Sequence, residues 1–226
     1  PTDYFVRIRE ICDRHDILMI VDEVVTGFGR TGLNFGIEHF GVVPDIMATG
    51  KGLSSGYTPI AATVVSDEVY DAIYQKQRSF VHGHTYGGNP LSCAVSLAVQ
   101  DYIDAHDLVE NCRRMGERML EKLKPLKGNP IVGAVRGMGL LTGVEFVADK
   151  ETRAPFPVEQ GVTAAIVEGV MARKVLIMPG APGLVDGVAG DHVAISPPFT
   201  VSEEQVDETV RVVIEAVDET AKALGY

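Results

Sequence analysis

The chain has 226 residues, of which 46% are hydrophobic and 23% charged, and its formal net charge is −11 at pH 7. This composition provides enough apolar material for a packed core in one or two domains. No uninterrupted apolar run approaches the roughly 20 residues that a membrane helix needs, so we expect a soluble protein without a membrane partner. A chain this acidic repels phosphate backbones, which argues against nucleic acid as a partner.

The three cysteines, Cys12, Cys93 and Cys112, show no metal-ligand spacing. An odd number of cysteines in apolar surroundings is typical of free thiols in a reducing compartment. We therefore expect a cytoplasmic protein with neither a metal site nor a catalytic cysteine. The first residues, Pro1-Thr2-Asp3, look like neither an initiator methionine nor a signal peptide, so we expect the gene product to begin upstream.

The first half of the chain alternates helical and β-strand patterns. We expect helices over residues 4–15 and 91–103, and strands over residues 17–21, 46–48 and 60–65. The run at 17–21 is continuous and apolar, which is typical of a strand buried on both faces in a parallel sheet. Asn89 followed by Pro90 is a favourable helix start, because Asn caps the helix and Pro suits its first position.

The pattern changes after residue 108, where glycines interrupt an alternating segment. We expect helices over residues 108–123, 162–173 and after a capping box at 202–205, antiparallel strands over residues 132–147, and short strands over residues 175–177 and 193–195. The chain is therefore predicted to belong to the α/β class. A first domain over residues 1–108 would be followed by a smaller α+β domain over residues 109–226.

Two candidate catalytic residues follow predicted strands. Asp22 ends the run at 17–21, and open α/β sheets bind ligands at the carboxyl ends of their strands. An acid at this point is equally consistent with a helix cap or a surface residue. Lys51 stands between Gly50 and Gly52 directly after a strand, so it can reach into a pocket and act as a nucleophile. The alternative is an ordinary solvated lysine, which is the usual state of this residue type.

A phosphate site is indicated by Thr85, which lies in a glycine-rich loop ahead of a predicted helix start. A hydroxyl and free backbone N–H groups suit a phosphate there. His82 and His84 flank Thr85, but two histidines without a cysteine or an acid are weak evidence for a metal. The run around Lys51 is not a Walker phosphate loop, because it lacks the four-residue gap and a glycine follows the lysine.

Two longer segments resemble the signature of class III pyridoxal-phosphate-dependent aminotransferases, the omega-transaminase-like family. They are residues 20–32 (IVDEVVTGFGRTG) and residues 44–52 (PDIMATGKG). The order and spacing of Asp22, Lys51 and Thr85 also match the family, as do the segments VRGMGL and SPPF nearer the C-terminus. The resemblance covers essentially the whole chain and identifies it as the C-terminal half of such a protein.

The resemblance implies a fold type I architecture, in which residues 1–108 are the C-terminal part of the PLP-binding large domain. It implies that pyridoxal 5′-phosphate (PLP) is the cofactor, that Lys51 binds it covalently and moves the reacting proton, and that Asp22 pairs with the pyridinium nitrogen. Val24 is implied to pack on one face of the ring. Thr85 is implied to reach the phosphate in the neighbouring subunit, so a homodimer with shared active sites is expected.

One departure from the family bears on the substrate. Relatives that use ornithine, acetylornithine or 4-aminobutyrate have an arginine three residues before the Pro197-Pro198 pair, where it binds a substrate carboxylate. This chain has Ala194 at that position, and no arginine occurs between Lys174 and Val210. Alanine cannot replace a planar guanidinium. The expected reaction therefore moves an amino group from an amine or omega-amino acid to a small keto acid such as pyruvate.

Several alternatives remain open. A decarboxylating transaminase, an aminomutase and a racemase of the same family would use the same cofactor. A non-catalytic fragment is the alternative from a different class, because the family's upstream half is absent from this sequence. That half carries a phosphate-binding turn and an aromatic residue that stacks on the ring, so we expect the isolated segment to be inactive.

Overall fold

The computed structural model describes residues 2–77, 79–181 and 183–226. The chain divides into two compact units, Pro1–Glu110 and Asn111–Tyr226, and both combine helices with a β-sheet. Within the described ranges, no helix has the length and apolar character to cross a bilayer.

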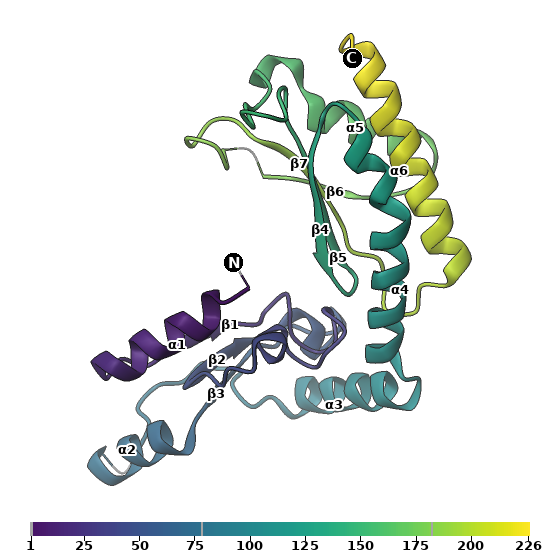
Figure 1. The fold of residues 1–226 in the computed structure, drawn as a ribbon. Coiled ribbons are helices and arrows are strands. Elements are labelled where there is room, and N and C mark those ends of the chain that lie inside the picture. Colours follow the sequence, from purple (N-terminus) through teal and green to yellow (C-terminus); the bar gives the residue numbers. More distant parts are fainter. Residues whose placement is uncertain (1, 78, 182) are drawn as a thin grey trace. The chain divides into compact units, whose positions relative to one another are not determined.

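The first unit contains a three-stranded sheet in the order β1-β2-β3 (Figure 1). Its elements are α1 (Tyr4–His15), β1 (Ile20–Asp22), the 3-10 turn η1 (Gly36–Phe40), β2 (Ile46–Thr49), the 3-10 turn η2 (Lys51–Leu53), β3 (Ala62–Val65), α2 (Asp67–Gln77) and α3 (Pro90–Ala105). Strands β1 and β2 are parallel, whereas β2 and β3 are antiparallel. The predicted helix start is confirmed, because the Asn89 side chain accepts a hydrogen bond from the Ser92 N–H at 3.1 Å.

A small core connects α1 to this sheet. Apolar side chains on one face of α1 pack against a cluster that includes Met19 and Val21. An ion pair supports the same contact, since Arg9 Nη1 lies 2.7 Å from Oδ2 of Asp45. The Arg9 guanidinium, together with the Met19 N–H, holds the pKa of the Asp45 carboxyl below its ordinary value.

The predicted burial of the first strand on both faces is wrong. Strand β1 is shorter than the apolar run, and the side chains of Ile17, Leu18 and Ile20 are 55%, 53% and 66% exposed. Strand β1 has β2 as its one neighbour among the described strands, so its outer edge is unpaired. An apolar run records a preference for burial, but no segment within the described ranges covers these three side chains.

The second unit contains a four-stranded antiparallel sheet in the order β4-β5-β7-β6. Its elements are α4 (Leu108–Leu123, which begins at the end of the first unit), η3 (Lys124–Gly128), β4 (Val132–Met138), β5 (Leu141–Phe146), η4 (Val158–Gln160), α5 (Val162–Ala172), β6 (Met178–Pro179), β7 (Asp191–Ile195) and α6 (Glu203–Ala223). The two antiparallel strands expected over residues 132–147 are confirmed. The strand expected at 175–177 is wrong, because the ladder with β7 begins only at Met178.

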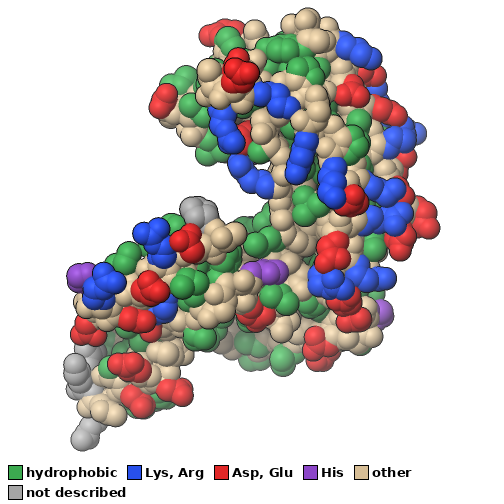
Figure 2. Space-filling model, in the orientation of Figure 1, with side chains coloured by type: hydrophobic (Ala, Val, Ile, Leu, Met, Phe, Trp, Pro, Cys, Tyr) green, Lys and Arg blue, Asp and Glu red, His purple; other side chains and the backbone are tan. Residues whose placement is uncertain are grey.

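Helices α4, α5 and α6 supply one side of the core of this unit, and alternate side chains of the sheet supply the other. The period-two pattern is clear in β5, where Thr142, Val144 and Phe146 are buried while the alternate residues Leu141, Gly143 and Glu145 are partly exposed. The predicted capping box at the start of α6 is confirmed, because Ser202 and Gln205 bond reciprocally. Acidic and basic side chains alternate over the outer surfaces of α4 and α6 (Figure 2).

Candidate functional site

Asp22 ends β1 and Lys51 comes shortly after β2, so both segments lie at the carboxyl ends of neighbouring strands in the first sheet. Asp22, the last residue of β1, is in register with Ala48 of the parallel strand β2, and the Glu23 N–H donates to the Ala48 carbonyl at 2.8 Å. Strand β2 ends at Thr49, and Lys51 begins the turn η2. Both residues therefore follow neighbouring parallel strands at the same end, where open α/β sheets bind their ligands.

Val24 lies between these two segments. Its Cγ1 and Cγ2 atoms lie 3.6 and 3.8 Å from the position that a Cβ atom on Gly50 would occupy. An apolar side chain thus lies beside the space that a side chain at the residue preceding Lys51 would occupy. The N–H of Val24 also donates to Oδ1 of Asp22 at 2.9 Å, which orients the carboxylate. The structure accordingly brings together the segments of three predicted cofactor residues, Asp22, Val24 and Lys51.

The two ionisable side chains are not bound to each other. Among the described residues, the Asp22 carboxylate accepts one hydrogen bond, from Val24, and the Lys51 Nζ atom makes no ion pair. Both side chains are exposed. A carboxylate and a primary amine in this state are available to a ligand.

The backbone at Lys51 is in the left-handed region, with φ at +39°. This region costs a residue with a Cβ atom roughly 1–2 kcal/mol, so the surrounding structure has to hold the turn. Inside the turn, the Leu53 N–H donates to the Gly50 carbonyl at 2.9 Å, and the Ser54 N–H donates to the Lys51 carbonyl at 3.2 Å. Gly52 packs closely against the next segment, since a Cβ atom there would lie 3.0 Å from the Cβ of Phe28.

Glu23 is a site residue that sequence reasoning did not single out. It is 1% exposed, and its carboxylate accepts hydrogen bonds from the N–H groups of Gly36 (2.9 Å) and Ile37 (2.7 Å) and from the hydroxyl of Thr26. Charge-assisted bonds of this kind are roughly twice as strong as neutral ones. Glu23 thereby ties together the two ends of the glycine-punctuated loop that follows Asp22. An acid directly after the end of a strand was the available signal.

Thr85 is exposed, in the loop that leads to α3. The rings of His82 and His84 contact each other edge to face in the same loop, with centroids 5.0 Å apart. Within the described ranges, no hydrogen bond connects Thr85 to Asp22 or Lys51. The structure of one chain therefore does not assemble Thr85 with the other three predicted residues.

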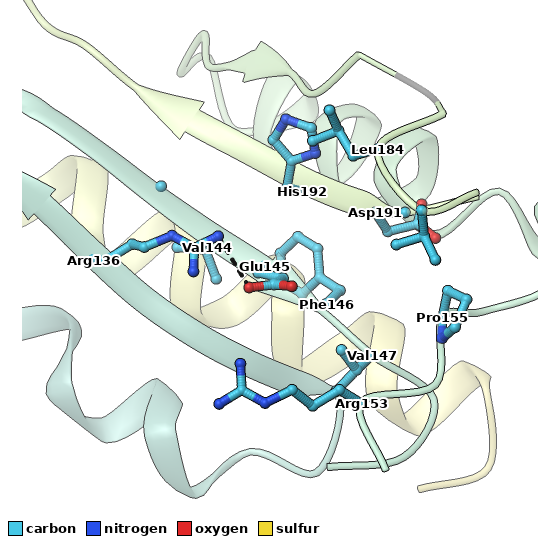
Figure 3. Close-up of a pocket in the computed structure, with 13 residues that line it drawn as sticks. Arg136, Val144, Glu145, Phe146, Val147, Arg153, Pro155, Leu184, Asp191 and His192 are labelled. Atoms are coloured by element: carbon cyan, nitrogen blue, oxygen red, sulfur yellow. Dashed lines mark ion pairs between the residues drawn. The ribbon is translucent and has the colours of Figure 1, made fainter. Parts of the chain in front are cut away.

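The second unit presents an open sheet face with small side chains at its centre. Ala194 on β7 is in register with Gly143 on β5, which is in register with Arg136 on β4. Figure 3 shows a pocket on this face, of about 160 Å³, where the Arg136 guanidinium is already paired with Glu145 at 3.1 Å. The Ala194 position, where some relatives are expected to have a substrate-binding arginine, is thus occupied by a small, uncharged side chain on this sheet face.

The family model for class-III aminotransferases matches residues 1–217. The aminotransferase YodT of Bacillus subtilis is 42% identical over 225 residues, which cover 99% of this chain and 50% of that protein. Gamma aminobutyrate transaminase 3 of Solanum lycopersicum is 40% identical over 213 residues, which cover 93% of this chain and 39% of that protein. The solved structure of an amine transaminase from an uncultivated Pseudomonas species, in its PLP-bound form, is 38% identical with a TM-score of 0.89; it covers 97% of this chain and 48% of that chain.

The architecture is therefore that of fold type I PLP-dependent transferases: part of the large α/β domain, followed by a smaller α+β domain. The chain belongs to the class-III aminotransferase family. It spans half or less of the length of the curated relatives it matches, as expected for a C-terminal part.

The residues present fit PLP chemically. The Asp22 carboxylate, whose one hydrogen bond among the described residues comes from the Val24 N–H, can bind a protonated ring nitrogen, and the unpaired amine of Lys51 can react with an aldehyde carbon. The apolar side chain of Val24, which lies near Gly50, suits a face of the ring. Phosphate ligands are not evident among these three residues. Thr85, with an exposed hydroxyl in the loop before α3, remains the predicted phosphate ligand.

Proposed function

We propose that the complete protein carrying this chain is a PLP-dependent aminotransferase whose cofactor is held by Lys51 and Asp22. When bound, PLP supplies an electron sink for the bond that breaks at the carbon carrying the amino group. Lys51 binds the cofactor covalently and then moves the proton between that carbon and the cofactor C4′. The charge of Asp22 keeps the ring nitrogen protonated, and Val24 excludes water from one face of the ring.

The observation that carries this proposal is the register of the first sheet. The pairing of Asp22 with Ala48 places the Asp22 carboxylate at the strand end from which the Lys51 turn begins. The Val24 side chain, two residues after Asp22, lies beside the space that a side chain on Gly50 would occupy, next to Lys51. A cap or surface role for Asp22 would not require a second ionisable residue at the same edge of the sheet, nor an apolar side chain between them.

For the substrate, we propose an amine or omega-amino acid as donor and a small keto acid such as pyruvate as acceptor. The support is Ala194, which offers no charge, together with the arginine nearest in register, Arg136, which is already bound to Glu145. The similar amine transaminase agrees with this donor class. The similar gamma aminobutyrate transaminase is named for a donor that Ala194 disfavours, so the proposed donor differs from the one in that name.

We also propose a homodimer in the cytoplasm, in which Thr85 of one subunit binds the cofactor phosphate of the other. The exposed position of the Thr85 loop, without bonds to Asp22 or Lys51 among the described residues, supports this arrangement. None of Cys12, Cys93 and Cys112 forms a disulfide in the part of the chain that the structure describes, which agrees with a reducing compartment.

The test of the cofactor site is Lys51→Ala in the complete protein, with Lys174→Ala as a matched control. Lys174 is also exposed and also has a left-handed backbone, with φ at +62°. We expect Lys51→Ala to lose the visible absorbance of covalently held cofactor and to lower transamination by several orders of magnitude, while Lys174→Ala retains both. Borohydride reduction and peptide mapping should find the cofactor on Lys51. Release of the keto product without CO2 separates transamination from decarboxylation, and wild-type activity in Lys51→Ala would refute the assignment.

The isolated chain is expected to be inactive. Ile20 on β1 and Val64 on β3 are 66% and 50% exposed, and β1 has an unpaired edge, a combination that favours aggregation. The measurement is the absorbance of residues 1–226 after incubation with PLP and desalting. A soluble protein that retains PLP and transaminates would contradict this expectation.

A further inference from the structure

Helix α3 presents a polar row to the turn that carries Lys51. Ser92, Ser96 and Gln100 are spaced by four residues, so they lie on one face of the helix. The Ser92 and Thr58 hydroxyl oxygens are 2.8 Å apart. Eight residues further along the helix, Gln100 Nε2 donates to the carbonyl oxygens of Gly52 at 3.2 Å and Leu53 at 3.1 Å.

These two carbonyls belong to the one-turn helix η2, and the last carbonyls of a short helix have no partner inside it. A carbonyl oxygen accepts and never donates, so the amide group of Gln100 has to face them with its nitrogen. That nitrogen carries two N–H bonds, one for each carbonyl. Gln100 thus satisfies both carbonyls with one half-buried side chain.

The turn is held by two further segments. Gln100 binds the Gly52 and Leu53 carbonyls from α3, while Gly52 packs closely against the segment of Phe28. Because the left-handed backbone at Lys51 is intrinsically unfavourable, the turn depends on such outside contacts to keep its conformation. Removing one contact should therefore alter how the Lys51 amine is presented before it alters the fold.

We propose that Gln100 is a positioning residue, which fixes through two backbone carbonyls the turn that presents Lys51. The inference rests on the proposed function in so far as Lys51 is the cofactor lysine. Gln100 itself does not touch the reacting atoms. Its effect should appear as a change in the orientation and reactivity of the Lys51 amine.

Three substitutions in the complete protein test the proposal. Gln100→Glu keeps the shape and removes the N–H donors, Gln100→Met keeps the length and removes all polarity, and Gln100→Lys keeps a donor. Asp101→Asn, at an exposed neighbouring position on α3, is the matched control. The first readout is competitive acetylation of the cofactor-free protein, quantified as the ratio of labelled Lys51 to labelled Lys174. The second is the steady-state rate of the PLP-loaded protein and the pH midpoint of its absorbance.

We expect the acetylation ratio to change by roughly threefold or more in the Glu and Met variants, the smaller end of what a lost hydrogen bond produces. We expect kcat to fall roughly tenfold with a smaller change in KM, and the absorbance midpoint to move. The Lys variant should recover most of each change, and Asp101→Asn should match the wild type. If the Met variant fails to fold, the Gln100→Glu variant provides the test, because glutamate differs from glutamine only in having an oxygen atom in place of the amide NH2 group.

An unchanged acetylation ratio in folded Glu and Met variants would overturn the positioning role, as would equal defects in the Lys and Met variants. Failure of the proposed function looks different. In that case Lys51→Ala retains covalently bound cofactor, whereas the acetylation ratio still reports whether Gln100 controls the presentation of Lys51.

Discussion

The substitution Gly116→Ala tests two effects on the free energy of unfolding that oppose each other: alanine has the higher helix propensity, but its side chain would overlap a neighbouring turn. Gly116 is a buried residue inside α4, where alanine is ordinarily favoured by about 0.8–1 kcal/mol. A Cβ atom at Gly116 would lie 2.2 Å from the carbonyl oxygen, 2.3 Å from the carbonyl carbon and 2.5 Å from the Cα of Gly139. All three are backbone atoms of the tight β4–β5 turn, where Gly139 itself has φ at +51°.

Neither partner can relieve this overlap by rotating a side chain, so helix or hairpin has to move by about an ångström. Overpacking of this kind typically costs about 1–3 kcal/mol, and more where backbone resists. After the gain in propensity, we expect a net loss of roughly 2 kcal/mol of unfolding free energy. For a domain of this size, that lowers Tm by roughly 4–8 °C.

The assay is thermal and urea unfolding of the complete protein, with Gly128→Ala as the matched control. A Cβ atom at Gly128 would meet nothing within 4 Å, and Gly128 does not have a positive φ. Gly128→Ala should therefore be neutral or stabilising by up to about 1 kcal/mol. If Gly116→Ala is as stable as Gly128→Ala, helix propensity decides and the close backbone contact is not a constraint.

Three further predictions concern charge. Asp22→Asn should leave covalent cofactor binding intact but slow proton abstraction roughly 10²-fold, equivalent to about 3 kcal/mol, in single-turnover kinetics; an unchanged rate makes Asp22 a structural acid. Ala194→Arg should raise the kcat/KM ratio of carboxylate-bearing donors over simple amines by roughly tenfold or more, and an unchanged ratio separates this position from the substrate. Hydrogen bonds from Arg118 and, to a smaller extent, from Lys122 lower the pKa of Asp207 to about 2. The stabilisation of the folded state by the ionised Asp207 side chain should therefore be complete above the unfolded-state pKa of about 3.9 and should disappear as the pH falls toward 2. Urea titrations of wild type and Asp207→Asn should converge across that window, and a constant difference would contradict the ion pair as the cause.

The sequence predicted elements whose signals are local. Helix α1, the Asn89 cap and the capping box at Ser202 depend on residues within one or two turns, and all three are present. Helix α2 was not predicted, because its periodic side chains, such as Tyr70 and Tyr74, remain half exposed and give a weak pattern.

Predictions failed where partners distant in sequence decide the structure. The run at 175–177 has strand-forming residues, but the Val175 N–H bonds to the Val170 carbonyl at the end of α5. It is therefore unavailable for a ladder, and pairing with β7 starts at Met178. The same reason explains the exposed face of β1, since an apolar run alone does not tell which segment covers it.

The candidate site divides in the same way. Asp22 and Lys51 could be found because each follows a strand pattern, and Lys51 has a glycine on either side. Glu23 and Gln100 could not be found, because their backbone partners are distant in sequence. The partners of Glu23 lie 13 and 14 residues away, and those of Gln100 lie 47 and 48 residues away. A glutamine in line with two serines on a largely apolar helix was the one local sign of Gln100.

The residues that hold the site bind mainly backbone groups. Glu23 accepts from the N–H groups of the loop after Asp22, and Gln100 donates to the carbonyls of the turn after Lys51. Backbone atoms are present whatever the side chains are, so such anchors fix the geometry of a loop while leaving its sequence free to change. Under the proposed function, the family's chemistry would be retained while substrate preference changes elsewhere, at small side chains such as Ala194 on the open sheet face. This separation predicts that substitutions at Ala194 change donor selection without changing the acetylation of Lys51, and that substitutions of Gln100 do the reverse.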